Sequence, residues 1–92
     1  MYIGYIGLGK MGKNMVYNLK DHGWEVVAYN RSSEPREEVK KQDIKTVDSI
    51  ESLIQNLTSP RLIWVMVSHA AVDAILDDLI KYIEKGDTLI EG

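Results

Sequence analysis

The sequence has no cysteine, no long hydrophobic segment and no excess of positive charge. Without cysteine the chain cannot form a disulfide framework, a thiolate metal site or a cysteine nucleophile. Its longest uninterrupted apolar run covers residues 62–67, whereas a helix needs about 20 apolar residues to span a bilayer. The amino terminus lacks the basic region and apolar stretch of a secretory signal peptide. We therefore expect a cytoplasmic protein with no membrane partner.

The charge balance and the length limit the function further. The chain has 14 acidic and 11 basic side chains, for a net charge of −3. Nucleic-acid-binding domains usually present a basic face, so this balance argues against a nucleic-acid partner. A chain of 92 residues with 45% hydrophobic content predicts one small domain with a single core. The two histidines share no helical spacing, so no zinc site is expected.

Hydrophobic residues follow two alternating periods along the chain. Short β-prone runs predict five strands, over residues 2–6, 25–29, 44–47, 62–67 and 88–90. Between them, residues at helical spacing predict four helices, which begin near positions 10, 33, 49 and 72. Strands that alternate with helices indicate a parallel sheet covered on its faces. The predicted fold class is α/β: a Rossmann-like, doubly wound parallel sheet of five strands in a three-layer αβα arrangement.

Three local signals describe the helices in more detail. Met11 and Met15 are four residues apart on the first helix and are expected to lie in the core. Asp48 precedes Glu51 by three residues, which predicts a capping box at the start of the third helix. Gly86 follows the apolar stripe of the fourth helix and is expected to end it.

The segment after the first predicted strand has the pattern G-x-G-x-x-G and consists of Gly7, Leu8, Gly9, Lys10, Met11 and Gly12. It leaves a strand and opens a helix, as this motif does in dinucleotide-binding folds. Gly7 permits a tight turn, Gly9 lets the backbone approach a pyrophosphate, and Gly12 lets helix and strand pack closely. The N–H groups and the dipole of the helix start favour bound phosphate. The pattern predicts dinucleotide binding; the alternative is a structural glycine turn with Lys10 simply exposed.

The end of the second predicted strand bears on cofactor choice. NAD-binding domains carry a carboxylate there, which accepts hydrogen bonds from the ribose hydroxyls. This chain has Asn30, Arg31 and Ser32 instead, with no carboxylate before Glu34. At a separation of about 4 Å and an effective dielectric of about 20, a carboxylate would repel a 2′-phosphate by about 4 kcal/mol. An arginine guanidinium binds phosphate through charged donors. The turn predicts NADP rather than NAD; the alternative is a polar turn with a solvated arginine.

Residues 7–15 resemble the signature of the β-hydroxyacid dehydrogenases, a superfamily that includes 3-hydroxyisobutyrate and 6-phosphogluconate dehydrogenases. Residues 26–32 are similar to the NADP-type turn of the decarboxylating 6-phosphogluconate dehydrogenases. Residues 59–67 resemble the fourth strand of those enzymes, and residues 86–92 resemble the fifth. The resemblance covers nearly the whole chain, and the last two segments are its most specific part.

The resemblance implies the amino-terminal, NADP-binding domain of an oxidoreductase of the pentose phosphate pathway. Such enzymes oxidise 6-phosphogluconate with NADP and release carbon dioxide, which leaves ribulose 5-phosphate. The resemblance also implies that the glycine loop holds the pyrophosphate and that residues 30–32 hold the 2′-phosphate. It places Val67, Ser68 and His69 along the nicotinamide side, although residues 68–71 depart from the family pattern. The alternative for His69 is a loop histidine without a catalytic role.

The resemblance further implies that residues 1–92 are an incomplete domain, truncated before the helical substrate domain of the enzyme. The catalytic residues of the family and most of its dimer interface belong to that later domain, so this chain contains no assigned catalytic residue. We expect the 92-residue chain alone to be inactive and the full-length protein to be a homodimer that acts on 6-phosphogluconate. Two alternatives remain. One is another β-hydroxyacid dehydrogenase, acting on 3-hydroxyisobutyrate or a semialdehyde, and the other is a free-standing nucleotide-binding module without catalysis.

Overall fold

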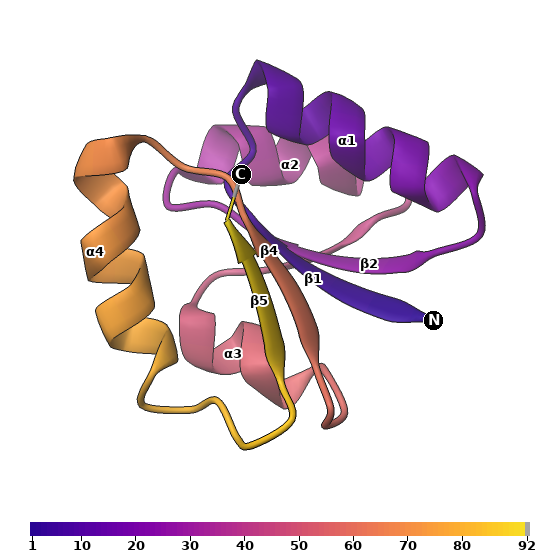
Figure 1. The fold of residues 1–92 in the computed structure, drawn as a ribbon. Helices are drawn as coiled ribbons and strands as arrows, with labels where there is room; N and C mark the ends of the chain where they lie inside the picture. The colour runs from indigo at the N-terminus through magenta and orange to yellow at the C-terminus, as the bar shows by residue number, and fades with distance from the viewer. Residues whose placement is uncertain (92) are drawn as a thin grey trace.

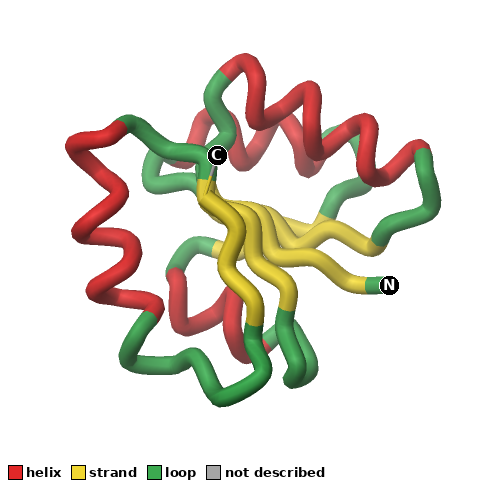
Figure 2. The backbone as a smooth tube through the Cα atoms, in the orientation of Figure 1, coloured by secondary structure: helices red, strands yellow, loops and turns green. Residues whose placement is uncertain are grey.

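The computed structural model describes residues 1–91, in which strands and helices alternate along the chain (Figure 1, Figure 2). In chain order the elements are β1 (Tyr2–Ile6), α1 (Lys10–Asp21), β2 (Glu25–Tyr29), α2 (Ser33–Lys40), β3 (Lys45–Val47), α3 (Ile50–Gln55), β4 (Leu62–Val65), α4 (His69–Leu79) and β5 (Thr88–Glu91). No helix of this described part is long and apolar enough to cross a membrane. The predicted order of elements is confirmed.

The five strands form one parallel sheet in the order β3-β2-β1-β4-β5. The central strands end level with one another, because Ile6 pairs with Tyr29 on one side and with Val65 on the other. The chain moves from β1 outward to β2 and β3, then returns past β1 to β4 and β5. This reversal confirms the doubly wound sheet, and it places the switch point of the strand order between β1 and β4. Open α/β sheets bind their ligands beyond the carboxyl ends of the strands at such a point.

Helices cover both faces of the sheet and complete the three layers (Figure 1). On one face, Tyr5 and Val16 belong to a buried cluster that joins β1, β2, α1 and α2. On the other face, Leu53 and Ile63 belong to a cluster that joins the sheet to α3 and α4. Strands with helices on both faces need apolar residues at successive positions. This need explains the apolar run at 62–67.

Two predictions about helix starts are wrong in detail. Met11 is 71% exposed, because the buried residues of α1 are Gly12 and Val16, which turn Met11 away from the sheet. Met15, one turn later, is partly buried against the core. At α3 the cap is Ser49 rather than Asp48. The Ser49 hydroxyl accepts a hydrogen bond from the Ser52 N–H at 3.0 Å, as a serine at that position can.

The fourth helix also differs from its prediction. It begins at His69 and ends at Leu79, which is earlier at both ends than the apolar stripe suggested. His69 is therefore the first residue of α4 rather than a loop residue. Gly86 does not end the helix. It has a φ of +97° and forms part of the turn into β5, in which the Asp87 N–H donates to the Glu84 carbonyl at 3.0 Å.

Candidate functional site

Three segments meet at the carboxyl edge of the sheet, each a loop with or without the start of the helix that follows it, and together they hold every residue predicted to bind a cofactor (Figure 1). They follow β1, β2 and β4, which are neighbours in the sheet and run in the same direction. The glycine motif lies in the centre, the turn 30–32 lies on one side, and residues 67–69 lie on the other. The fold therefore brings the three predicted segments together at the point where the strand order reverses.

Two of the three motif glycines are required by the fold itself. Gly7 has a φ of +106°, and a Cβ at this position would collide with the carbonyl of Met66. A Cβ at Gly12 would collide with the carbonyl oxygen of Gly7. The first glycine therefore permits the turn and the third permits the close approach of α1 to β1, whether or not a ligand is bound.

Gly9 differs from its neighbours in the motif. Its φ of −66° and ψ of −177° are extended backbone angles that any residue adopts. A Cβ at this position meets no atom within 4 Å. Nothing in the described part of the chain, residues 1–91, explains why this residue is glycine. The open space beside its backbone is the space that a closely approaching ligand would fill.

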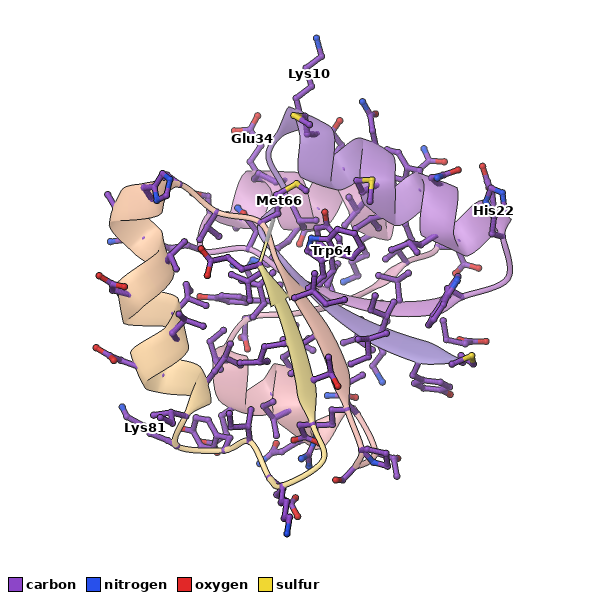
Figure 3. All side chains as sticks on the ribbon, in the orientation of Figure 1. Lys10, His22, Glu34, Trp64, Met66 and Lys81 are labelled. Carbon is purple, nitrogen blue, oxygen red and sulfur yellow. The ribbon has the colours of Figure 1, made fainter. Side chains whose placement is uncertain are left out.

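The start of α1 presents unpaired donors to the same space. Gly9 is the N-cap of the helix, and no side chain of the described residues caps this end. The first helical bond runs from the Lys13 N–H to the Gly9 carbonyl at 2.9 Å, so the N–H groups of residues 10–12 have no acceptor within residues 1–91. The first turn carries no acidic side chain, and Lys10 extends away from the fold (Figure 3). These features favour an anion at the positive end of the helix dipole.

Asn30 connects the glycine loop to the turn after β2. Its Oδ1 accepts a hydrogen bond from the Leu8 N–H at 2.8 Å, and its Nδ2 donates to the Ser32 carbonyl at 3.2 Å. The backbone makes a parallel link, because the Gly7 N–H donates to the Tyr29 carbonyl at 2.9 Å. The bond to Leu8 was not predicted from the sequence. The pairing of β1 with β2 could have suggested it, because that pairing puts the residues after both strands side by side.

The remaining predicted residues differ in accessibility. Arg31, Ser32, Ser68 and His69 are exposed along the carboxyl edge, so their side chains are free to meet a ligand. The side chain of Leu8 is 1% exposed and belongs to the core. Only the backbone of this residue faces the loop, and its N–H is already bonded to Asn30.

In the segment 67–69, which follows β4, Val67 is the residue whose side chain packs against the core. Its side chain is half-buried and packs against the cluster on the α3 and α4 face. Directly after it, Ser68 is the N-cap of α4, and its carbonyl accepts hydrogen bonds from the N–H groups of Ala71 and Val72. Val67 therefore fixes the direction in which this segment leaves the strand.

At the opposite, amino edge of the sheet, where the strands begin, lies an ionic cluster that was not predicted from the sequence. The Asp87 carboxylate has no exposed surface and accepts bonds from the N–H groups of Arg61 at 2.7 Å and Glu84 at 2.9 Å. The Arg61 guanidinium lies 3.0 Å from Asp87 and 3.1 Å from Glu84. Desolvation raises the pKa of Asp87, but these bonds and one from Ser59 lower it by more, so that the pKa falls from 3.8 to about 2. The cluster joins the starts of β4 and β5.

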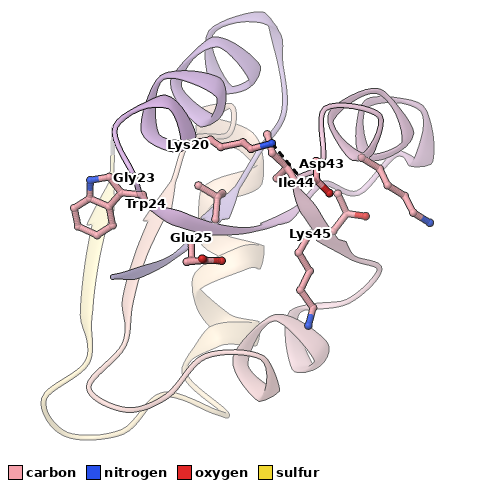
Figure 4. A pocket seen from close by; sticks show the side chains of 10 residues that line it. Lys20, Gly23, Trp24, Glu25, Asp43, Ile44 and Lys45 are labelled. Atoms are coloured by element: carbon pink, nitrogen blue, oxygen red, sulfur yellow. Dashed lines mark ion pairs between the residues drawn. The ribbon is translucent and has the colours of Figure 1, made fainter.

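The amino edge also contains a cleft of about 750 Å³ between the ends of α1 and α2 (Figure 4). Its lining includes Lys20, Lys40 and Lys45 together with Glu25 and Asp43. Lys20 and Lys40 lie in the last turns of their helices, where a lysine complements the negative end of the dipole. Because these charges serve the helix ends and parallel sheets bind ligands at the other edge, the cleft is not the candidate site.

Relatives of known sequence match this chain over almost its whole length. A 6-phosphogluconate dehydrogenase (decarboxylating) from Chlamydia muridarum is 43% identical over 98% of this chain. An NADP(+)-dependent, decarboxylating 6-phosphogluconate dehydrogenase from Bacillus subtilis is 42% identical over 98%. In both cases the match covers 20% of the relative. This chain thus spans about a fifth of the length of these curated relatives.

Solved structures show the same fold in other dehydrogenases and reductases. An imine reductase from Myxococcus stipitatus in complex with NADP+ superimposes with a TM-score of 0.84 and 20% identity, over 99% of this chain and 31% of that chain. An arogenate dehydrogenase from Synechocystis gives 0.82 and 19%, over 99% and 32%. At the level of sequence, the family profile described as the NAD binding domain of 6-phosphogluconate dehydrogenase matches residues 2–92. The chain therefore belongs to the family of NAD(P)-binding domains of 6-phosphogluconate dehydrogenase.

Proposed function

We propose that this chain binds NADP at the carboxyl edge of the sheet, with the pyrophosphate on the start of α1. The observation that carries the proposal is the environment of Gly9, a glycine that the fold does not require. It lies beside N–H groups that have no acceptor within residues 1–91. A pyrophosphate would fill the open space and accept hydrogen bonds from those groups.

The turn 30–32 is proposed to select NADP over NAD. Arg31 and Ser32 are exposed at this turn, and neither they nor Asn30 carry a negative charge. The arginine supplies charged donors to a 2′-phosphate, and the Asn30 amide holds the turn against the glycine loop. The Bacillus subtilis relative is NADP(+)-dependent, and the Myxococcus stipitatus structure contains NADP+. These two proteins support the same preference here.

When bound, the cofactor supplies a hydride acceptor. The residues of this chain bind and orient it, with Val67, Ser68 and His69 proposed to line the nicotinamide side. In the full-length protein we propose the oxidative decarboxylation of 6-phosphogluconate. The substrate loses a hydride to NADP and its carboxyl carbon as carbon dioxide, which yields ribulose 5-phosphate and NADPH. The remainder of the enzyme would supply the substrate site, the catalytic groups and the dimer interface.

Calorimetric titration of the 92-residue chain with NADP and with NAD tests the cofactor assignment. We expect tighter binding of NADP, and Arg31→Ala should weaken NADP binding by about tenfold or more, because one charged hydrogen bond contributes about 1.5–3 kcal/mol. The same substitution should leave NAD binding nearly unchanged. Lys41→Ala is the matched control, because it removes an equal charge from the far end of α2. Tighter binding of NAD, or equal effects of the two substitutions, would contradict the assignment.

The reaction is tested separately with the full-length gene product. We expect NADPH formation and carbon dioxide release with 6-phosphogluconate, and neither with 3-hydroxyisobutyrate. Turnover of 3-hydroxyisobutyrate instead would assign the protein to another branch of the β-hydroxyacid dehydrogenases. Absence of turnover with intact NADP binding would support the stand-alone nucleotide-binding module.

A further inference from the structure

Beside α1, one face of β4 and β5 is not covered by any helix of the described residues (Figure 1). The side chains that point out of this area are apolar. We call this area the open step, and it is formed by Met11 and Met15 of α1, Leu62, Trp64 and Met66 in and after β4, and Ile90 of β5. Ile90 belongs to it because it is the register partner of Trp64, and paired residues point to the same face. None of the six side chains is charged.

The two faces of β4 show how incomplete the cover of the open step is. Ile63 and Val65 point to the α3 and α4 face and are 0% and 1% exposed. Trp64, which alternates with them, is only partly buried, as are Leu62 and Met66 on the same face. On the helix side of the step, Met11 is 71% exposed. An exposed apolar area of this kind on a soluble domain commonly marks an interaction surface.

Trp64 presents an apolar surface to the open step. Its ring stacks on Tyr5 with the ring centroids 6.1 Å apart. Its Nε1 is already buried by the described residues, so the part of this side chain that stays exposed is apolar carbon. Figure 3 shows that Trp64 and Met66 lie on the side of β4 and β5 that faces α1.

A further parallel strand would not cover the open step. Crossover connections in parallel sheets are right-handed, so the direction of travel across the sheet fixes the face on which the connecting helix lies. Travel from β1 to β3 placed α1 and α2 on the face of the step, and travel from β4 to β5 placed α4 on the opposite face. A strand added beyond β5 would put its helix beside α4. The cover must therefore come from a segment that is not such a crossover.

We propose that the open step is the seat of one apolar helix from the part of the polypeptide that the longer relatives have and residues 1–92 do not include. Those relatives extend over about five times the length matched here, since the match covers 20% of them. Two strands about 4.8 Å apart provide a floor about one helix wide, and helices pack 8–10 Å apart, so one helix fits beside α1. Methionine adapts its shape to an apolar partner, and three of the four methionines of the chain lie on the step.

The methionines also provide the test. Oxidation of methionine by hydroxyl radicals, followed by mass spectrometry, reports the exposure of each thioether. We expect Met11 and Met15 to oxidise about fivefold more slowly in the full-length protein than in the 92-residue chain, both without cofactor, because burial removes access. Met1 is 83% exposed and lies just before the central strand β1, at the amino edge, so it serves as the internal control and should react equally in both. Equal rates for Met11 in the two proteins would overturn the proposal.

Two further outcomes would also overturn it. Protection of Met11 in the 92-residue chain itself, with a dimer in sedimentation velocity, would assign the step to a second copy. A gene that encodes no residues after Gly92 would leave no segment to fill the open step.

A substitution pair adds an independent measurement, since Met11 and Ile80 are both 71% exposed. Met11→Asp should lower the melting temperature more in the full-length protein than in the 92-residue chain, whereas Ile80→Asp should shift it by the same amount in both. Because the comparison is made without NADP, its failure leaves the proposed cofactor function untouched.

Discussion

The two edges of the sheet differ in whether their polar groups have hydrogen-bond partners. At the amino edge, the Asp87 carboxylate accepts hydrogen bonds from the Arg61 guanidinium and from the backbone N–H groups of Arg61 and Glu84. At the carboxyl edge, the first N–H groups of α1 have no acceptor within the described residues, and Gly9 faces open space. Both edges belong to the same five strands. A fully bonded cluster stabilises the fold at one edge, whereas the groups without partners at the other edge lie where we propose that the cofactor binds.

The largest effect is expected when the amino edge is broken at Asp87. Asp87→Asn replaces a carboxylate oxygen with an NH₂ group that faces two other donors, Arg61 Nη1 and the Glu84 N–H. We expect the free energy of unfolding at pH 7 to fall by about 3 kcal/mol, as when one partner of a buried ion pair is removed. Urea denaturation measures this change. Asp77→Asn, at an exposed position of α4, should change it little.

Acid provides a check on the same substitution. The pKa of Asp87 is lowered from 3.8 to about 2 in the folded chain, so its contribution to stability is present above about pH 4. That contribution is lost as the pH falls from about 4 toward 2. The difference in stability between the wild type and Asp87→Asn should therefore decrease over this range. A difference independent of pH would show that the carboxylate charge is not the stabilising group.

The next effect concerns ligand binding rather than stability. Gly9→Val should weaken NADP binding by about a hundredfold, because a side chain at this position would displace the pyrophosphate from one or two charged hydrogen bonds of about 1.5–3 kcal/mol each. The melting temperature should fall much less than it does for Gly12→Ala, since a Cβ at Gly9 meets no atom within 4 Å. Calorimetry and thermal denaturation measure the two properties.

Gly12→Ala supplies the contrast, because a Cβ there collides with the Gly7 carbonyl. It should lower the melting temperature clearly. If Gly9→Val bound NADP as the wild type does, the open space at Gly9 would have no role in binding, and the comparison of the two edges would fail.

The smallest effect is expected at the link between two loops of the carboxyl edge. Asn30→Ala removes the acceptor of the Leu8 N–H and should lower the free energy of unfolding by about 1 kcal/mol, the usual contribution of one hydrogen bond. It should also weaken NADP binding, because the loop and the turn 30–32 lose their connection. Asn30→Asp keeps the acceptor and should retain most of the stability. If both variants were equally destabilised, the bond to Leu8 would not be the stabilising contact.

The fold was predictable because central, doubly covered strands leave a continuous apolar signal and surface helices leave a periodic one. The glycine motif was predictable because strand, turn and helix must follow one another closely for it to work. The ends of the helices were harder to predict from the sequence. At α4, Ile80 and Ile83 continue the apolar stripe, although the helix ends at Leu79. Apolar residues in a following turn can pack on the same core and imitate another helical turn.

The pairing of Arg61 with Asp87 was not predictable from sequence. These residues are 26 positions apart and meet only because β4 and β5 are neighbours in the sheet. Their roles depend on a register that no local pattern encodes. The exposure of Met11 was missed for a related reason, since four-residue spacing identifies a helical stripe but does not say which side of it faces the sheet.

The bond from Leu8 to Asn30 has a consequence for the evolution of cofactor preference. The atom that accepts this bond is a side-chain oxygen, and aspartate carries an oxygen at the same place. A change from asparagine to aspartate at position 30 therefore keeps the glycine loop anchored while it adds the negative charge that disfavours a 2′-phosphate. Because the same residue anchors the loop and lies in the turn proposed to select the cofactor, a substitution at position 30 would change the proposed preference without removing the anchor of the glycine loop.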